Sequence, residues 1–267
     1  MSVAEPNDLF DLGGRTALVT GAAGHLGAAI ARALSGAGAT LYLAGRRADP
    51  LESLATELGA SAHVLPLDVT DSTAVAQALS VIEAEHGRLD VLVNNAHSGR
   101  TGTLETARAD DYANAFAVSV QSSAELARLG LPLMRKAVAL AGQASVVNIS
   151  SMYGMVSPDP AIYGDSGHNS PPYYGAAKAG ILQYTRYAAV HLAAEKIRVN
   201  AISPGPFPKQ KVAQSMPELW TILNDKPPMK RVGQPHEIGG AALFLASDAA
   251  SYVTGINLPV DGGWTAW

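Results

Sequence analysis

Residues 16–27 read Thr-Ala-Leu-Val-Thr-Gly-Ala-Ala-Gly-His-Leu-Gly, and this stretch sets the expectation for the fold. Residues 16–20 form a short apolar run with β-branched side chains, which predicts a buried strand. Gly21, Gly24 and Gly27 follow, and the small residues after them are typical of a helix. A strand, a glycine-rich turn and a helix in this order can bind a pyrophosphate, because backbone amides and the helix N-terminus approach it.

Strand-like and helix-like segments alternate through the rest of the chain. This alternation predicts a parallel sheet with right-handed crossovers, and its apolar strands predict helices on both faces. No polar linker divides the sequence, so we expect residues 1–267 to form one doubly wound α/β domain of about seven strands. Further strands are predicted at 40–44, 62–67, 90–93, 145–149, 198–202 and 256–259, and helices at 26–36, 50–58, 73–86, 110–141, 174–194 and 235–246.

The composition argues against several function classes. A net charge of −4 gives no sign of a nucleic-acid partner. The chain has no cysteine, and its seven histidines show neither HxxxH nor HExxH spacing, so we expect no disulfide and no metal site. No apolar run reaches the ~20 residues of a membrane span. The N-terminal residues lack the apolar segment of a signal peptide, which predicts a cytoplasmic protein.

Tyr174 and Lys178 lie four residues apart in a predicted helix and therefore share one face, whereas Tyr173 points elsewhere. A phenol ordinarily loses its proton near pH ~10, and a neighbouring ammonium lowers that pKa. Such a pair can give or take a proton at a carbonyl or alcohol oxygen. An isolated pair at this spacing is more often a surface tyrosine and lysine, so the other motifs decide its meaning.

An ordered set of short motifs extends over nearly the whole chain. Together they resemble the short-chain dehydrogenase/reductase family. By this resemblance Ser151, rather than Ser150, would polarise a substrate carbonyl, Tyr174 would exchange the proton, and Lys178 would hold the nicotinamide ribose. The motifs are the glycine turn, Asn94-Asn95-Ala96, Ser150-Ser151, Tyr174 with Lys178, and Ser203-Pro204-Gly205.

The resemblance also implies a nicotinamide dinucleotide cofactor. The end of the second strand decides between NAD(H) and NADP(H), because an acidic residue there would bind the ribose 2′-hydroxyl. This chain has Gly45 in that place and Arg46 next to it, which favours NADP(H) over NAD(H). A solvated pair at the start of a helix is the alternative reading of Arg46 and Arg47. The implied cofactor contacts are Gly21, Gly24, His25, Leu26, Gly27, Arg46, Asp68, Val69, Asn95, Ala96, Tyr174, Lys178, Pro204 and Gly205.

Four positions depart from the family pattern. His25 replaces a glycine of the turn, which either tolerates the side chain or uses it to contact the cofactor. His97 follows Asn-Asn-Ala where the family has glycine, and no threonine follows Pro204-Gly205 to bind the carboxamide. Ser119 stands where the family often has an asparagine that holds a water for proton relay, so it is a candidate catalytic residue.

Two loops should border the substrate. Residues 157–172 lengthen the connection between Ser151 and Tyr174 and are too rich in proline and glycine for a regular element. Residues 206–231 match the region that the family uses as a mobile lid. Candidate polar contacts in or near the first loop are Tyr153, Tyr163, Asp165, His168 and Asn169. Candidate apolar lining residues in the second are Met216, Leu219, Trp220 and Leu223.

The sequence therefore predicts an NADP(H)-dependent oxidoreductase that interconverts a carbonyl and a secondary alcohol in a small molecule. A cofactor-binding relative with little or no turnover, and an epimerase or lyase that uses the same tyrosine, are the alternatives. The resemblance further implies a homo-oligomer, a tetramer or a dimer, in which Trp264 and Trp267 could be buried by a partner subunit.

Overall fold

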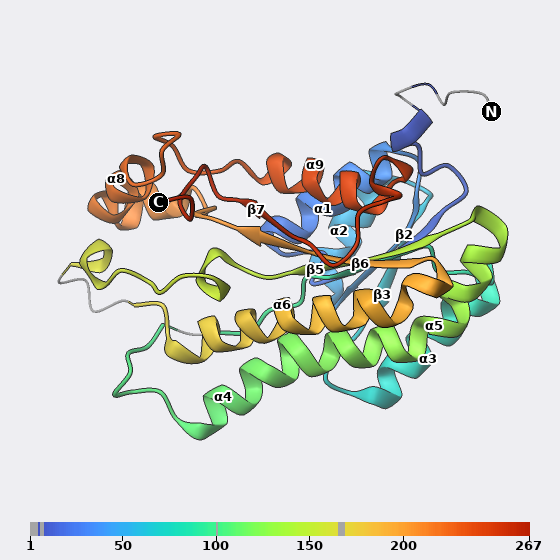
Figure 1. The fold of residues 1–267 in the computed structure, drawn as a ribbon, viewed down its shortest axis with the longest axis horizontal. Coiled ribbons are helices and arrows are strands. Elements are labelled where there is room, and N and C mark those ends of the chain that lie inside the picture. Colours follow the sequence, from blue (N-terminus) through green and yellow to red (C-terminus); the bar gives the residue numbers. More distant parts are fainter. Residues whose placement is uncertain (1–4, 6–7, 100, 165–168) are drawn as a thin grey trace.

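A computed structural model describes residue 5 and residues 8–99, 101–164 and 169–267. A seven-stranded sheet forms its centre, with all strands parallel and in the order β3-β2-β1-β4-β5-β6-β7 (Figure 1). The expected doubly wound α/β fold is confirmed. The strands are β1 (Thr16–Thr20), β2 (Thr40–Gly45), β3 (Ala62–Pro66), β4 (Val91–Asn94), β5 (Ala144–Ile149), β6 (Ile197–Pro204) and β7 (Asn257–Val260).

Helices cover both faces of this sheet (Figure 1). Buried residues of α1, α2 and α9 pack on one face, and those of α3, α5 and α6 pack on the other. The helices are α1 (His25–Gly36), α2 (Ala48–Leu58), α3 (Ser72–His86), α4 (Ala109–Phe116), α5 (Ser122–Ala141), α6 (Pro172–Leu192), α7 (Lys211–Ser215), α8 (Pro217–Asp225) and α9 (Pro235–Ala246).

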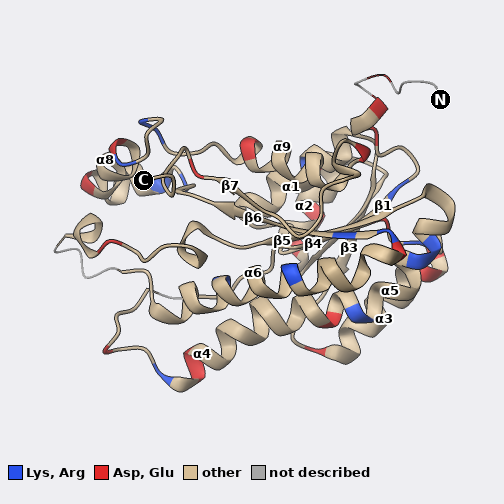
Figure 2. Cartoon of the chain, in the orientation of Figure 1, with Lys and Arg blue, Asp and Glu red and all other residues tan. Residues whose placement is uncertain are grey.

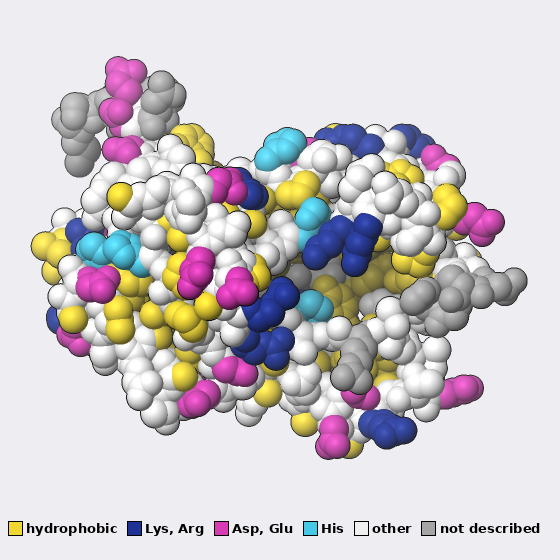
Figure 3. All heavy atoms as spheres, turned by 180° about the vertical axis from the view of Figure 1, so that it is seen from behind, with side chains coloured by type: hydrophobic (Ala, Val, Ile, Leu, Met, Phe, Trp, Pro, Cys, Tyr) yellow, Lys and Arg dark blue, Asp and Glu magenta, His cyan; other side chains and the backbone are white. Residues whose placement is uncertain are grey.

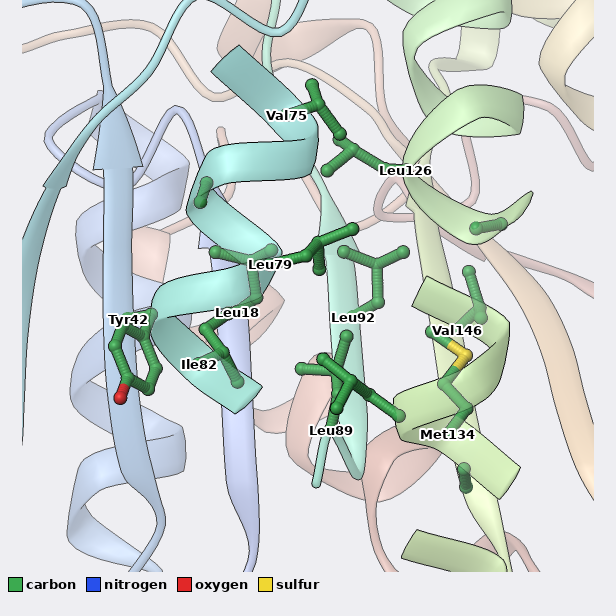
Figure 4. Close-up of a cluster of buried hydrophobic side chains, with 14 of the residues drawn as sticks. Leu18, Tyr42, Val75, Leu79, Ile82, Leu89, Leu92, Leu126, Met134 and Val146 are labelled. Carbon is green, nitrogen blue, oxygen red and sulfur yellow. The ribbon is translucent and has the colours of Figure 1, made fainter. Parts of the chain in front are cut away.

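Apolar side chains fill the space between the sheet and its helices. Figure 4 shows one such layer, in which Leu79 from α3 and Leu126 from α5 lie over Leu92 of β4. Strand β4 is buried on both faces, as expected for the centre of a parallel sheet. Figure 2 shows that basic and acidic residues lie mainly on the helices and loops around the strands.

The predicted helix at 110–141 is wrong in one respect, because a π-helical turn at Ala117–Gln121 separates α4 from α5. The hydroxyls of Ser122 and Ser123 donate to the carbonyl oxygens of Val118 and Ser119, one turn earlier. Hydroxyl bonds of this kind compete with the regular backbone pattern and bend helices. Single π turns often occur at functional sites, and this one contains the buried Ser119.

The strand order reverses between β1 and β4, which lie side by side at the centre of the sheet. Connections from these strands leave toward opposite sides, and ligands of open α/β sheets bind in the crevice beyond the carboxyl ends at such a point. Among the described residues, no helix combines the length and the apolar character needed to cross a bilayer.

Candidate active site

A cavity of about 830 Å³ opens at the carboxyl ends of the central strands. Figure 3 shows a hollow in one face of the molecule, bordered by Lys or Arg side chains and by histidines. The cavity brings together all the proposed site residues except Ser119, which is absent from its described lining. Those it includes are Gly21, Gly24, His25, Leu26, Gly27, Arg46, Asp68, Val69, Asn95, Ala96, Ser151, Tyr174, Lys178, Pro204 and Gly205.

The glycine turn is held in place by Asn95. The Asn95 side-chain amide donates to the carbonyl oxygens of Thr20 and Gly21, at 3.0 and 3.1 Å. Gly21 has a φ of 62°, a conformation that favours glycine. A Cβ atom at Gly27 would lie 2.2 Å from the carbonyl oxygen of Gly21, so only glycine allows α1 to start this close to the turn.

Basic side chains border the end of the cavity beyond β2. Arg46 and Arg47 are exposed and line the cavity between the end of β2 and the start of α2, and Lys209 lines it from the far side of the glycine turn. Asp68 receives hydrogen bonds from the backbone and hydroxyl of Thr70, which lower its pKa, and the charge of Arg46 lowers it further. An ionised Asp68 therefore accompanies the arginines at this end.

His25 is the first residue of α1 and lines the cavity. Its Nε2 is buried and has no hydrogen-bond partner among the described residues. Burial and the charge of Lys209 both lower the pKa of this imidazole, so His25 is neutral at physiological pH. His25 therefore contributes a neutral imidazole to the lining beside the glycine turn.

Hydrogen bonds fix the residues at the other end of the cavity. The Ser150 hydroxyl donates to the carbonyl oxygen of Lys178, and the Lys178 ammonium donates to the carbonyl oxygen of Ile149, both at 2.8 Å. The Ser151 hydroxyl accepts a bond from the backbone amide of Tyr153 at 3.1 Å and also bonds the Tyr174 phenol. Ser150 therefore anchors α6 to the end of β5, while Ser151 reaches the phenol.

Tyr174, and not Tyr173, faces this end. Tyr173 is buried against Ala115 and Ala177 and meets the ring of Tyr112 edge-on, with 5.9 Å between the ring centroids. Tyr174 lines the cavity and is only partly buried by the chain. The spacing argument from the sequence therefore selects the tyrosine whose ring borders the cavity.

The expected effect of Lys178 on Tyr174 is wrong for this structure. Burial raises the pKa of Tyr174, and the hydrogen bond with Ser151 offsets this only in part. The Lys178 ammonium donates to the carbonyl oxygen of Ile149 and lies over the Tyr174 ring, 5.9 Å from its centre. Burial also lowers the pKa of Lys178, to about 8. Desolvation thus dominates over charge–charge attraction in this pair.

His97 contributes more to the site than the sequence indicated. Its ring meets the Tyr174 ring edge-on, with centroids 5.2 Å apart, and its exposed surface borders the cavity. Protein packing and the charge of Lys178 lower the pKa of His97 to about 4, so it is neutral at physiological pH. Asn114 and Ser98, joined by a 3.3 Å hydrogen bond, lie on the same lining. Asn114 carried no signal in the sequence, because α4 approaches the cavity only in the folded chain.

The two loops that we expect to border the substrate contact each other. Asp159 of the first loop forms an ion pair with Lys226, which follows α8 in the second. Tyr153 and Tyr163 approach with their hydroxyls 3.4 Å apart. Asn169 has a buried amide oxygen without a partner among the described residues, whereas Asp165 and His168 lie outside the described residues.

One expectation about apolar residues is wrong. Trp264 is buried within its own chain, against Met152 and Ile162, and is not left free for a partner subunit. Met216, Leu219, Trp220 and Leu223 are absent from the described lining of the cavity, and Leu223 packs on the same cluster as Trp264. Trp267 is 83% exposed. Trp264 and Leu223 pack together in a cluster that sequence patterns do not show.

Comparison with known proteins agrees with this geometry. A family model described as enoyl-(acyl carrier protein) reductase matches residues 21–265. The chain is 38% identical over 263 residues to galactitol 2-dehydrogenase (L-tagatose-forming) of Cereibacter sphaeroides, with 97% of this chain and 98% of that one covered. The chain belongs to the short-chain dehydrogenase/reductase family. This is a family of oxidoreductases, and the expected resemblance is confirmed.

Solved structures of this family superimpose closely on the chain. The Pseudomonas aeruginosa RhlG/NADP active-site complex aligns with a TM-score of 0.87 and 31% identity, covering 96% of this chain and 98% of that one. A gluconate 5-dehydrogenase from Burkholderia cenocepacia, in complex with NADP and tartrate, aligns with a TM-score of 0.86 and 29% identity, covering 98% and 100%.

Gly27→Ala is expected to lower the free energy of unfolding by about 1–3 kcal/mol, because the new methyl group would overlap the turn. Its nearest atoms would be the Gly21 carbonyl oxygen at 2.2 Å and the Asn95 amide nitrogen at 2.7 Å. Gly36→Ala at the other end of α1 is the matched control, since a Cβ there meets nothing within 4 Å. Urea unfolding of both variants measures the difference, and equal losses would contradict the close approach.

Proposed function

We propose that this protein is an NADP(H)-dependent oxidoreductase that interconverts a carbonyl and a secondary alcohol, with residues 1–267 acting as one catalytic domain. The observation that carries the proposal is a single cavity with two chemically different ends. Ser151, Tyr174 and Lys178 meet at one end, and the glycine turn with Arg46 lies at the other. The two NADP complexes among the structural relatives support the same cofactor class.

The residues present fit a dinucleotide phosphate. A volume of about 830 Å³ is within the usual size of cofactor sites. The start of α1 offers backbone amides and a positive dipole end to a pyrophosphate, and His25 lines the cavity at this helix end. Arg46 can bind a 2′-phosphate, and no carboxylate at Gly45 opposes it. NADPH, when bound, supplies the hydride.

The remaining cofactor contacts follow from the family position of each residue. We assign Asp68 and Val69 to the adenine, Asn95 and Ala96 to the adenosine side of the sheet, and Pro204 with Gly205 to the nicotinamide face. All six residues line the cavity.

Tyr174 is proposed to exchange the proton. Because burial raises its pKa, the phenol carries its proton at neutral pH, which is the form needed to protonate a carbonyl oxygen during reduction. The Ser151 hydroxyl, already bonded to the phenol, can donate to that same oxygen. The Lys178 ammonium, charged below about pH 8, is proposed to hold the nicotinamide ribose beside Tyr174. In the reverse direction Tyr174 accepts the alcohol proton.

Ser119 is proposed to help renew the Tyr174 proton. It lies buried in the π turn, and this turn packs against α6, the helix that carries Tyr174 and Lys178. A serine is shorter than the asparagine that the family often has here, so a water would have to bridge the distance to α6.

Hydroxylated ketones are the substrate class that we propose. The lining near Tyr174 includes the polar side chains of His97, Ser98 and Asn114, which can bond substrate hydroxyls. The galactitol and gluconate dehydrogenases among the relatives are named for polyhydroxylated substrates. This polar lining favours such a substrate over a simple apolar ketone.

We also propose a homo-oligomer, a dimer or a tetramer. Large apolar side chains are exposed on the helices that flank the sheet, including Phe116 at the end of α4 and Val190 on α6. A partner subunit would remove this surface from water.

Tyr174→Phe is expected to lower the turnover of hydroxyketone reduction by about 10²–10⁴-fold, since the variant lacks the proposed acid. Binding of NADPH, followed by fluorescence, should change little. Tyr187→Phe on the same helix is the matched control, because its ring is 60% exposed and far from the cavity lining. Unchanged turnover in Tyr174→Phe would eliminate the mechanism.

Arg46→Ala is expected to weaken NADPH binding roughly tenfold to hundredfold, the loss of a charge-assisted hydrogen bond, while NADH binding stays nearly constant. The comparison uses dissociation constants for both cofactors. Arg32→Ala is the control, since Arg32 pairs with Glu57 on the outside of α1. Equal losses for NADPH and NADH would show that Arg46 does not select the phosphate.

The kcat/KM for NADPH is expected to fall as pH rises above about 8. Burial lowers the pKa of Lys178 to about 8, so its ammonium is present below that pH and is lost above it. His97, with a pKa of about 4, and Tyr174, with a raised pKa, change little there. In Lys178→Arg the guanidinium keeps its charge, and the alkaline decline should move to higher pH. An unmoved decline in that variant would assign it to another group.

A further inference from the structure

A second group of polar side chains lies away from the cavity, at the edge of the sheet. His63 belongs to the edge strand β3, and Glu85 and His86 are the last two residues of α3. Tyr42 of β2 is the parallel partner of His63. None of the four lines the described cavity. Figure 3 shows histidines gathered next to acidic side chains on this face, well apart from the hollow.

The three titratable residues converge on one point. One potential ligand atom from each of His63, Glu85 and His86 lies within 4.8 Å of the others. The centroids of the two imidazoles are 5.7 Å apart, with their planes at 68°. Two imidazoles bound to one zinc ion at about 2.0 Å hold their centroids roughly 5 Å apart, so the rings are already near such an arrangement.

The ligand atoms of His63, Glu85 and His86 would have to move slightly closer together to bind one zinc ion. Ligand atoms around a tetrahedral zinc ion lie about 3.3 Å apart, given bonds of about 2.0 Å. In the structure His63 Nδ1 lies 3.9 Å from the nearer Glu85 oxygen. Glu85 and His86 are exposed at the end of their helix, so side-chain rotation can supply the difference without moving the backbone.

Tyr42 contacts all three residues of this cluster. Its buried phenol donates a hydrogen bond of 2.5 Å to Glu85 Oε2 and thereby orients the carboxylate. The Tyr42 ring also stacks on His63, with centroids 5.1 Å apart, and meets His86 edge-on at 5.7 Å. Burial and then the Glu85 hydrogen bond raise the pKa of Tyr42, so the phenol remains a donor. Partners of this kind orient ligands in zinc sites and raise their affinity.

We propose that His63, Glu85 and His86 bind one zinc ion, with water in the remaining position. Two imidazole nitrogens and one carboxylate oxygen suit zinc or a similar transition metal better than magnesium or calcium, which prefer oxygen ligands alone. No spacing in the sequence indicates this site, because His63 and Glu85 come from separate elements and Glu85-His86 has no metal-binding spacing. A bound ion would join the edge strand to the end of α3.

A simpler reading is an ion pair between His63 and Glu85, with His86 favourably placed at a helix C-terminus. Zinc titration separates the two. Tag-free protein, freed of metal with EDTA, is titrated with ZnCl₂ by calorimetry and thermal unfolding. We expect one ion per chain and a rise in Tm of about 5 °C when zinc exceeds its Kd about a hundredfold. MgCl₂ should produce no rise.

Single substitutions identify the ligands. His63→Ala and His86→Ala should each weaken zinc binding at least about tenfold, as should Glu85→Gln. His191→Ala and His236→Ala remove other exposed histidines and should leave the Kd unchanged. All variants should keep carbonyl reductase activity, because none of these residues lines the cavity.

Tyr42→Phe tests whether the hydrogen bond from Tyr42 to Glu85 contributes to zinc binding. The variant keeps the ring and removes only the donor. Zinc affinity should fall about tenfold to hundredfold. The proposal is overturned if the wild-type protein binds no zinc, if His63→Ala binds it as tightly as wild type, or if Tyr42→Phe has no effect. Should one alanine variant fail to fold, Glu85→Gln and the absorption of bound Co²⁺ give the same decision.

Discussion

The hydrogen bonds between Asn95 and the glycine turn hold the site together. The Thr20 hydroxyl accepts from the backbone amides of Asn95 and Ala96, while the Asn95 side chain donates back to Thr20 and Gly21. These bonds cross from β1 to β4, where the strand order reverses. Together with the bond that the Thr20 hydroxyl donates to the carbonyl oxygen of Val93, they fix the start of α1 relative to the end of β4.

At the other end of the cavity, burial sets the pKa values of Lys178 and Tyr174. The buried Lys178 ammonium donates a hydrogen bond to the backbone carbonyl oxygen of Ile149 at the end of β5. The same enclosure lowers the pKa of the lysine and raises that of Tyr174. The phenol of Tyr174 therefore carries its proton at neutral pH. Its pKa would fall only if a group bound in the cavity stabilised the phenolate.

The fold and most of the site follow from local sequence. Buried parallel strands are apolar on both faces, so their sequences are recognisable. Glycine is required where Gly27 approaches the turn, so its position in the sequence marks the turn. Tyr174 could be chosen over Tyr173 because helix geometry puts it on the side of Lys178. In contrast, the π turn at Ala117–Gln121, the burial of Trp264 and the convergence of His63 with His86 depend on contacts between distant segments. No local pattern encodes such contacts.

The ion pair between Asp159 and Lys226 has a consequence for how specificity can diverge in this family. It fastens the lengthened first loop to the segment behind α8, and Ile162 and Leu223 pack together beneath it. A change in one loop therefore alters the contacts of the other, so the two loops behave as one structural unit. Exchanging only one loop would leave a charge without its partner and would expose apolar side chains, whereas exchanging both loops together would keep both contacts.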